Sequence, residues 1–187
     1  MRLDGGMELT LELGPALSRP ELLAGPVAAA LGGWNASDAA EVAVAGIDPD
    51  LADTAEFSAR YGVALADSAN CVVVAARRGS TTTYAACVVL ATTRADVNGL
   101  VRRHLDARKA SFAPVDAVLA ATGMEYGGIT PIGLPADWPV LVDPAVAEHP
   151  RAVVGSGVRG SKLWVPGRLL AALPTAQVLP GLGVPIG

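Results

Sequence analysis

Alternating and continuous hydrophobic runs predict a sheet of short strands in this chain. Residues 70–75 form a β-branched run typical of a buried strand, and residues 84–90 form a second run after a turn at 77–80, so together they predict a β-hairpin. Further strands are expected over residues 7–13, 41–47, 109–113, 138–142, 151–154, 162–165 and 176–179.

Helical segments lie between these strands. They are expected over residues 21–31, 53–61, 114–122 and 168–173, with one more helix beginning at Thr93. Thr93 and Asp96 have the spacing of a capping box, and the helix that follows would turn Val97 and Val101 toward the core. Gly62 and Gly123 are expected to end their helices, because glycine readily adopts the left-handed conformation.

The order of these elements defines the expected fold class and domains. Short strands with interspersed helices, without regular βαβ alternation, predict an α+β fold in which helices flank a mixed, curled, barrel-like sheet. We expect residues 1–40 to be an N-terminal extension, a strand plus a helix, that packs on the main domain. Residues 41–180 would be that domain, and residues 181–187 a flexible tail.

The composition favours a single cytoplasmic domain. No run approaches the roughly 18 uninterrupted apolar residues of a membrane span, and the N-terminus lacks the basic start and apolar stretch of a secretory signal. Cys71 and Cys87 could pair if their strands are neighbours, but two cysteines in such a chain are more typically reduced, buried thiols. Neither has the neighbours of a zinc site, so no metal and no cofactor are predicted.

The net charge of −4 conceals an uneven distribution. Residues 1–76 carry three Arg and eleven Asp or Glu, whereas residues 77–168 carry eleven Arg or Lys and seven acids. The acidic chain argues against DNA as a partner, but the basic later part is compatible with a phosphate-bearing RNA end. For any one arginine, a solvated surface position is the simpler interpretation.

Two glycine-rich segments are the candidate functional elements. Gly155, Gly157 and Gly160 have the spacing of a dinucleotide-binding fingerprint, but the residues that follow have a strand pattern rather than a helical one, which disfavours that function. This segment is either a hairpin turn or a bare backbone that approaches a ligand closely. Residues 127–133 are either a simple connection or a holder of backbone N–H groups that stabilise an oxyanion.

Standard nucleophilic constellations are missing from the sequence. It contains no GxSxG elbow, HExxH pair or Walker-type loop, and His104 and His149 are expected on the surface. Asp143, at a predicted strand end, could orient a ligand amine or cap the turn that follows it. An enzyme built from these residues would work mainly by backbone positioning.

The combined order of these motifs resembles the YbaK family of aminoacyl-tRNA deacylases, the stand-alone relatives of the editing domain in bacterial prolyl-tRNA synthetases. Residues 127–131 match the GxxxP motif of that family, and residues 141–143 match its strand end of the Leu-Ile-Asp type. Residues 108–113 lie where the family has a basic segment. The likeness covers roughly residues 41–180.

The resemblance implies a trans-editing hydrolase that cleaves the ester between a mischarged amino acid and the terminal ribose of its tRNA. Water would attack with help from backbone groups, and the two glycine loops would come together to line the pocket. The implied partners are the acceptor end of aminoacyl-tRNA and, as a further candidate, an aminoacyl-tRNA synthetase. The implied residues are Asn70, Gly127 and Pro131 for catalysis, and Gly128, Thr130, Asp143, Ser156 and Gly157 for substrate binding.

One position departs from the family pattern. Asn70 stands where the family has a lysine, and the only lysines of the chain, Lys109 and Lys162, are expected elsewhere. An amide can hydrogen-bond a carbonyl or hydroxyl group but supplies no charge. The alternative function is therefore a non-catalytic module of the same fold that binds aminoacyl-tRNA, an amino acid or a protein.

Overall fold

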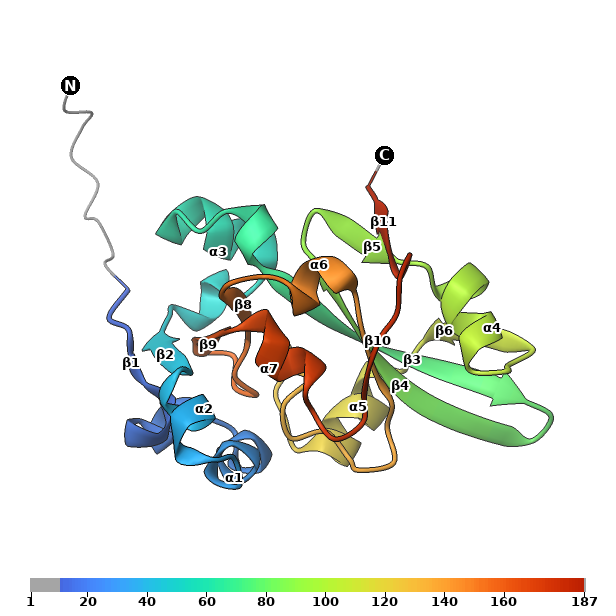
Figure 1. The fold of residues 1–187 in the computed structure, drawn as a ribbon, viewed down its shortest axis with the longest axis horizontal. Coiled ribbons are helices and arrows are strands. Elements are labelled where there is room, and N and C mark those ends of the chain that lie inside the picture. Colours follow the sequence, from blue (N-terminus) through green and yellow to red (C-terminus); the bar gives the residue numbers. More distant parts are fainter. Residues whose placement is uncertain (1–10, 187) are drawn as a thin grey trace.

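The computed structural model describes residues 11–186 and shows an α+β fold with three sheets (Figure 1). The central sheet has the order β10-β7-β4-β3-β6, the second has the order β1-β2-β9-β8, and β11 pairs with β5. The strands are β1 Gly14–Pro15, β2 Ala43–Gly46, β3 Ala69–Arg78, β4 Thr81–Leu90, β5 Thr93–Ala95, β6 Lys109–Phe112, β7 Val140–Val142, β8 Ala152–Gly155, β9 Ser161–Val165, β10 Ala176–Val178 and β11 Gly183–Pro185. In the central sheet β4, β7 and β10 are parallel, and the remaining pairs are antiparallel.

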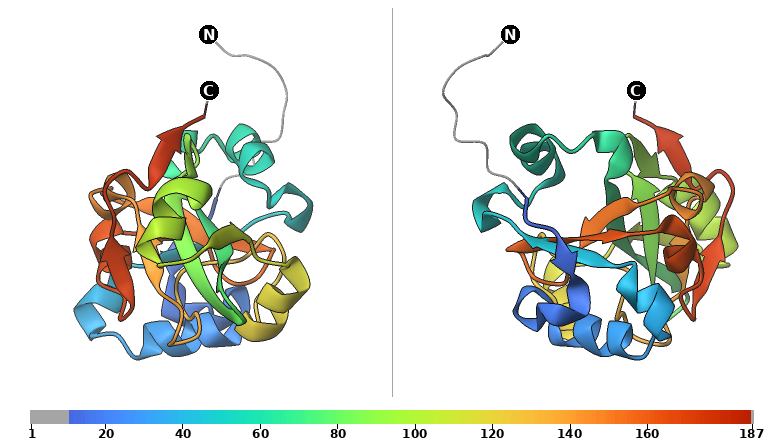
Figure 2. Two further views of the ribbon diagram at one scale, coloured as in Figure 1. Left: turned by 90° about the vertical axis from the view of Figure 1, so that its right-hand side faces the viewer. Right: turned by 60° about the vertical axis from the view of Figure 1, so that its left-hand side comes forward.

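The single curled, barrel-like sheet expected from the sequence is not formed. Within residues 11–186, β-pairing between the central and second sheets is confined to one isolated bridge between Ser68 and Val153. The ladder of backbone hydrogen bonds therefore stops between the two sheets, and neither sheet closes on itself. Two further views show the second sheet beside the central one rather than continuous with it (Figure 2).

Short helices connect and cover the strands. They are α1 Gly25–Gly32, α2 Ala36–Ala40, α3 Thr54–Tyr61, α4 Arg102–His104, α5 Val115–Thr122, α6 Pro144–Ala147 and α7 Gly167–Ala171, with 3-10 turns at Ala16–Ser18, Pro20–Leu22, Pro49–Leu51 and Leu65–Asp67 and a π-helical turn at Val97–Val101. The predicted stops of α3 and α5 are confirmed, because Gly62 and Gly123 follow them in the left-handed conformation.

The predicted hairpin of β3 and β4 is confirmed, and both strands are longer than their hydrophobic runs. Each has ten residues, and the turn falls at Gly79, which has a φ of 61°. The extra length is polar: the strands continue past the core through exposed arginines and threonines because backbone pairing does not require apolar side chains. This long hairpin carries one wall of the cavity described below.

The N-terminal segment differs from the prediction in detail. Helix α1 begins at Gly25 rather than at residue 21, because Ala24 is extended and donates its N–H to the Ser156 carbonyl at 3.1 Å. Pro26 then suits the first turn of the helix. Of the predicted strand at 7–13, residues 7–10 lie outside the described residues, and residues 11–13 form no regular element.

The expected capping box is replaced by a strand pair. Thr93 does not start a helix: it belongs to β5, which pairs with β11 at residues 183–185. Asp96 caps the next turn alone, accepting hydrogen bonds from the backbone N–H groups of Gly99 and Leu100. Within the predicted tail, β11 pairs its three residues with β5.

The main core joins elements from both ends of the chain. Val27 and Leu31 of α1 pack in one cluster with residues of β2, β4 and β9, including Val44, Val88 and Leu163. The segment predicted as an extension therefore contributes buried side chains to the main core. The opposite face of the hairpin packs in a second cluster, as the alternation of a β-strand requires.

The two glycine-rich loops lie against one another, as expected. Gly157 donates its N–H to the Gly128 carbonyl at 2.7 Å, and Glu125 donates its N–H to the Gly157 carbonyl at 2.8 Å. A Cβ placed on Gly155 would lie 2.3 Å from the Gly128 carbonyl oxygen and 2.5 Å from that of Ile129. Only a residue without a side chain allows this approach.

We expect Gly155→Ala to lower the free energy of unfolding by about 1–3 kcal/mol, because backbone atoms cannot move aside cheaply. Urea unfolding measures the change. The matched control is Gly32→Ala in α1, where an added Cβ meets no heavy atom within 4 Å, and its effect should stay within about 0.5 kcal/mol. Equal effects of the two substitutions would contradict the close loop contact.

Candidate functional site

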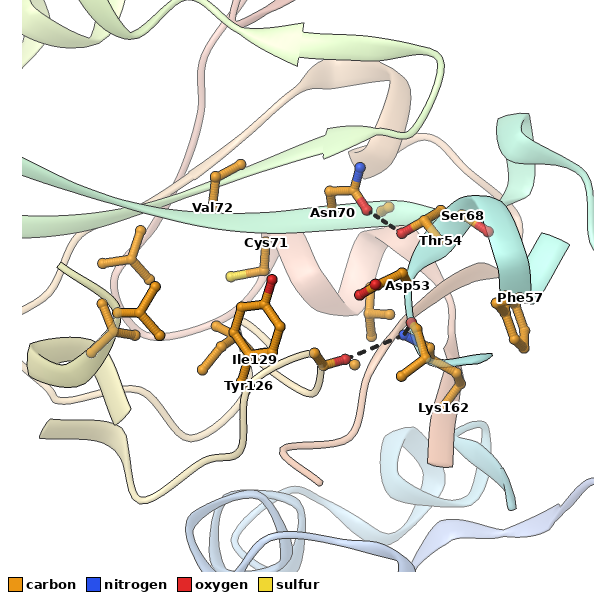
Figure 3. A pocket seen from close by; sticks show the side chains of 18 of the residues that line it. Asp53, Thr54, Phe57, Ser68, Asn70, Cys71, Val72, Tyr126, Ile129 and Lys162 are labelled. Atoms are coloured by element: carbon orange, nitrogen blue, oxygen red, sulfur yellow. Dashed lines mark hydrogen bonds between the residues drawn. The ribbon is translucent and has the colours of Figure 1, made fainter. Parts of the chain in front are cut away.

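A cavity of about 440 Å³ opens where the glycine loop 127–133 faces β3 (Figure 3). Residues of β3 form one wall, the start of α3 and the ends of β8 and β9 form a second, and α5 with the end of β6 closes the third. The lining residues are Ala52, Asp53, Thr54, Phe57, Ser68, Ala69, Asn70, Cys71, Val72, Val73, Phe112, Ala113, Val115, Val118, Leu119, Tyr126, Gly127, Ile129, Val153, Val154, Gly155 and Lys162.

Asn70 lies at the polar end of this cavity. Its side-chain oxygen accepts a hydrogen bond from the Thr54 hydroxyl at 2.8 Å, which ties β3 to the first residue of α3. The amide N–H₂ is then the group that Asn70 can offer to a carbonyl or hydroxyl oxygen of a ligand. Figure 3 shows Asn70, Thr54 and Asp53 together at this end of the cavity.

Lys162 lies in the same cavity, which corrects the expectation that both lysines lie elsewhere. Its side chain projects from β9 and is 7% exposed. The ammonium donates hydrogen bonds to the Ala52 carbonyl at 2.8 Å and, less closely, to the Gly127 carbonyl at 3.5 Å. It also lies 5.7 Å from the centre of the Phe57 ring. The cavity therefore contains a buried cation.

Burial governs the ionisation of Lys162. Removal from water disfavours the charged form and lowers the pKa of Lys162 from its ordinary value to about 8, although the carboxylate of Asp53 acts in the opposite direction. Arg159 adds to the lowering, and its guanidinium lies 3.9 Å from the Asp53 carboxylate. The amine thus changes its charge close to physiological pH.

The other end of the cavity is apolar. Val118, Leu119 and Ile129 line it together with the half-buried Cys71. Burial raises the pKa of the Cys71 thiol, with a further contribution from Cys87, so the thiol stays neutral and is a poor nucleophile at neutral pH. Both cysteines are free, as expected.

Three large apolar side chains surround the mouth of the cavity. Phe112, Val115 and Tyr126 all line it and are 66%, 49% and 59% exposed. Exposed apolar side chains gathered at the rim of a cavity are typical of a ligand-binding surface. The guanidinium of Arg159 lies 5.6 Å from the centre of the Tyr126 ring, which adds a positive charge to this rim.

Of the residues implied for the site in the loop 127–133, Gly127 lines the cavity and the others lie behind it. Gly128, Thr130 and Pro131 are buried and do not line the cavity. The Thr130 hydroxyl has no hydrogen-bond partner among the described residues. These three residues can therefore support the conformation of the loop but do not contact the cavity.

Ser156, Gly157 and Asp143 likewise lie away from the cavity lining. The Ser156 hydroxyl is 2.6 Å from the Ser161 hydroxyl, inside the second glycine loop. Asp143 caps α6 through the backbone N–H of Ala145 and accepts a second hydrogen bond from Gly183 at 2.7 Å. Asp143 thus caps the turn that follows its strand.

The sequence contained one signal for Lys162. It is the single charged residue in the otherwise apolar or small run of β9, and such a run predicts a strand buried on both faces. A buried lysine is rare without a specific partner or function. What the pattern did not show is that this face of β9 meets the glycine loop. The helix required for a dinucleotide site is replaced after Gly160 by β9 itself.

A model of the aminoacyl-tRNA editing domain matches residues 48–173. The match spans most of the chain, so this protein belongs to the aminoacyl-tRNA editing domain family. No match was found among curated protein sequences.

Solved structures agree with this fold. One, of a candidate trans-editing enzyme for prolyl-tRNA synthetase, has a TM-score of 0.69 at 19% identity, covering 94% of this chain and 100% of that one. Another, a scaffold protein for computationally grafted epitopes, has a TM-score of 0.69 at 20% identity, covering 88% and 100%. The expected α+β fold of the YbaK type is confirmed by this likeness. Within residues 11–186, no helix has the length and apolar character needed to span a membrane.

The lowered pKa of Lys162 predicts a stability that rises with pH. The unfolded chain keeps the lysine proton up to about pH 10, whereas the folded protein loses it near pH 8, so deprotonation favours the folded state between these values. As the pH rises from about 7 to 9, the free energy of unfolding of the parent should increase by about 1 kcal/mol relative to that of Lys162→Met. Urea unfolding at each pH measures the difference.

The comparison with Lys162→Met is needed because buried thiols make the free energy of unfolding fall as the pH rises, which is the opposite effect. Burial raises the pKa of Cys87 to about 12, so the folded protein retains a proton that the unfolded chain loses near pH 9. This effect is common to both proteins and cancels in their difference. The exposed Lys109 provides the control, since Lys109→Met should show no such pH-dependent difference. Parallel pH curves for the parent and Lys162→Met would refute the burial effect.

Proposed function

We propose that this protein is a trans-editing deacylase that removes mischarged amino acids from tRNA by hydrolysing the ester to the terminal ribose. The observation that carries this proposal is the cavity beside two interlocked glycine loops, with a polar and an apolar end, in a chain of the aminoacyl-tRNA editing family. Its natural location would be the cytoplasm, where tRNAs are charged, and a synthetase could hand the mischarged tRNA to it.

The two ends of the cavity suit the two parts of such a substrate. An apolar or small amino-acid side chain fits against Val118, Leu119 and Ile129. The ester and the ribose would then lie near Asn70 and Gly127. A terminal base at the mouth could stack on the exposed Tyr126, since base–aromatic stacking contributes about 1–3 kcal/mol.

Hydrolysis requires no nucleophilic side chain in this scheme. Water attacks the ester carbonyl carbon, the bond to the ribose oxygen breaks, and the amino acid leaves as a carboxylic acid while the ribose hydroxyl regains a proton. Asn70 would position the ester or the ribose hydroxyl through its amide, and the backbone of Gly127 would bound the reacting group. Gly128, Thr130, Pro131, Ser156 and Gly157 would hold the loops in place, and Asp143 would brace the adjoining strand end.

The cavity would suit the second selection step that editing provides. A synthetase pocket separates side chains that differ by one methylene by only about 1–3 kcal/mol, so errors among small apolar amino acids need a second selection step. A cavity whose inner end is apolar and of limited volume offers that second selection by size.

The direct test is release of amino acid from mischarged tRNAs. The first substrates are the tRNA for proline carrying cysteine and the same tRNA carrying alanine. We expect the protein to accelerate deacylation of at least one mischarged tRNA by more than about 100-fold over spontaneous hydrolysis, a modest part of ordinary enzymatic acceleration. Correctly charged prolyl-tRNA is the control and should be spared. Deacylation no faster than in buffer for any tested aminoacyl group would refute the enzyme.

A second candidate function is a binding module, and the uncharged Asn70 is the observation that favours it. The two functions predict opposite results for substitutions at this position. For an enzyme, Asn70→Ala should lower the deacylation rate by about 10–100-fold, because a polar contact to the reacting group is lost. For a binding module, the parent should not deacylate any aminoacyl-tRNA, and Asn70→Lys should acquire deacylase activity.

The matched control for Asn70→Ala is Asn98→Ala, since Asn98 is exposed and lies away from the cavity. Its deacylation rate should equal that of the parent. Thr54→Val adds a further check, because it removes the hydroxyl that holds the Asn70 amide and leaves the amide itself in place. A rate unchanged in Asn70→Ala would count against the role given to this amide.

A further inference from the structure

We propose that Lys162 is a catalytic residue of this cavity, whose ammonium contacts the ester carbonyl oxygen and stabilises the negative charge that forms there during hydrolysis. This role rests on the proposed deacylase function and assigns a charge to the reaction that Asn70 cannot supply. Lys162 projects from β9, whereas the position at which the sequence departs from its family, Asn70, lies on β3.

The position of the ammonium is the first argument. Within residues 11–186, Lys162 is the one lysine or arginine whose side chain is buried, and it is also part of the cavity lining. Moving an ammonium out of water is costly, and a lysine with only a structural task is normally placed with its charged end in solvent. A cation kept inside a ligand cavity is therefore best explained by the chemistry of a ligand.

The hydrogen bonds of the ammonium are the second argument. A lysine ammonium has three N–H donors. Two of them meet backbone carbonyl groups, that of Ala52 at 2.8 Å and that of Gly127 at 3.5 Å, and the second contact is long. The ammonium can therefore donate to a ligand oxygen with its third N–H, or exchange the weak contact to Gly127 for a stronger one.

The surroundings identify the ligand group as a developing oxyanion. The ring of Phe57 and the apolar lining keep the local dielectric low, which strengthens the attraction between a cation and a charge that appears only in the transition state. A phosphate of the tRNA end is charged before the reaction and well hydrated, so it is better served at the rim, where Arg159 lies beside Tyr126. The buried position of Lys162 suits the ester carbonyl.

The carboxylate of Asp53 lies near Lys162 but does not form a tight ion pair with it. This carboxylate favours the charged form of Lys162, but it is exposed and shared with Arg159. A tight ion pair would have occupied the ammonium and left little to offer a substrate. The arrangement keeps the lysine protonated in most molecules at neutral pH while leaving its charge available.

The test is single-turnover deacylation of the mischarged tRNA that the parent hydrolyses best, with Lys162→Met and Lys162→Gln. We expect the rate constant to fall by about 100–1000-fold in both, the usual effect of losing an oxyanion contact. Binding of the same tRNA carrying an amide-linked, non-hydrolysable amino acid should change by less than about threefold. Lys109→Met, the other lysine of the chain, should match the parent in both measurements.

The pH profile gives a readout that a purely structural lysine would not move. After subtraction of spontaneous hydrolysis, the parent rate relative to Lys162→Gln should fall above about pH 8, as the ammonium loses its proton. Lys162→Gln retains a donor for the Ala52 carbonyl without the charge, so it tests the role even if Lys162→Met fails to fold.

Each outcome decides the matter. Rates within threefold of the parent in a folded Lys162→Gln would overturn the proposal. Equal losses in rate and in binding of the amide-linked tRNA would also overturn it, in favour of a ground-state contact such as a phosphate. A parent inactive on every aminoacyl-tRNA would overturn the deacylase function and this role with it, whereas an active parent with an active Lys162→Gln would overturn this role alone.

Discussion

The hydrogen bonds between the two glycine-rich loops determine the position of almost everything at this site. Gly157 and Gly128 approach so closely that their backbones are bonded directly at 2.7 Å, and Gly155 lies against the same carbonyl groups. This contact places Gly127 beside the end of β9 and so brings Lys162 to the cavity. The extended segment at Ala24, bonded to Ser156, links the N-terminal helix to the same arrangement. A side chain on any of these glycines would separate elements that the site needs together.

The cavity combines an apolar interior with a few polar groups that are held by secondary structure. Asn70 is fixed on a long hairpin and by the Thr54 hydroxyl, and Lys162 is fixed on β9 by two backbone carbonyls. Because both side chains project from strands and are held by hydrogen bonds, the polar groups are preorganised for a ligand. Burial keeps the Cys71 thiol of the lining neutral, which is consistent with a reaction in which bound water attacks and the protein positions and stabilises.

The family and the fold agree with this chemistry at different levels. The editing-domain match covers the residues that build the cavity, from the turn before α3 to the end of α7. The likeness to solved structures is one of fold, at identities of 19–20%. Individual residues must therefore be interpreted from their own contacts. Those contacts separate Asn70, Gly127 and Lys162, which line the cavity, from Thr130, Ser156 and Asp143, which support the structure around it.

Local patterns in the sequence determined the hairpin, the ends of α3 and α5 at Gly62 and Gly123, and the loop character of the two glycine segments, because each depends on residues close together in the chain. Sheet closure, the pairing of β5 with β11 and the place of Lys162 were decided by tertiary structure. Lys162 shows the reason: its neighbours in β9 indicate only that it is buried, whereas its partners Ala52 and Gly127 are 110 and 35 residues away. Contacts at such separations leave no periodic trace in a single sequence, so the charge of the cavity became visible only when the chain was folded.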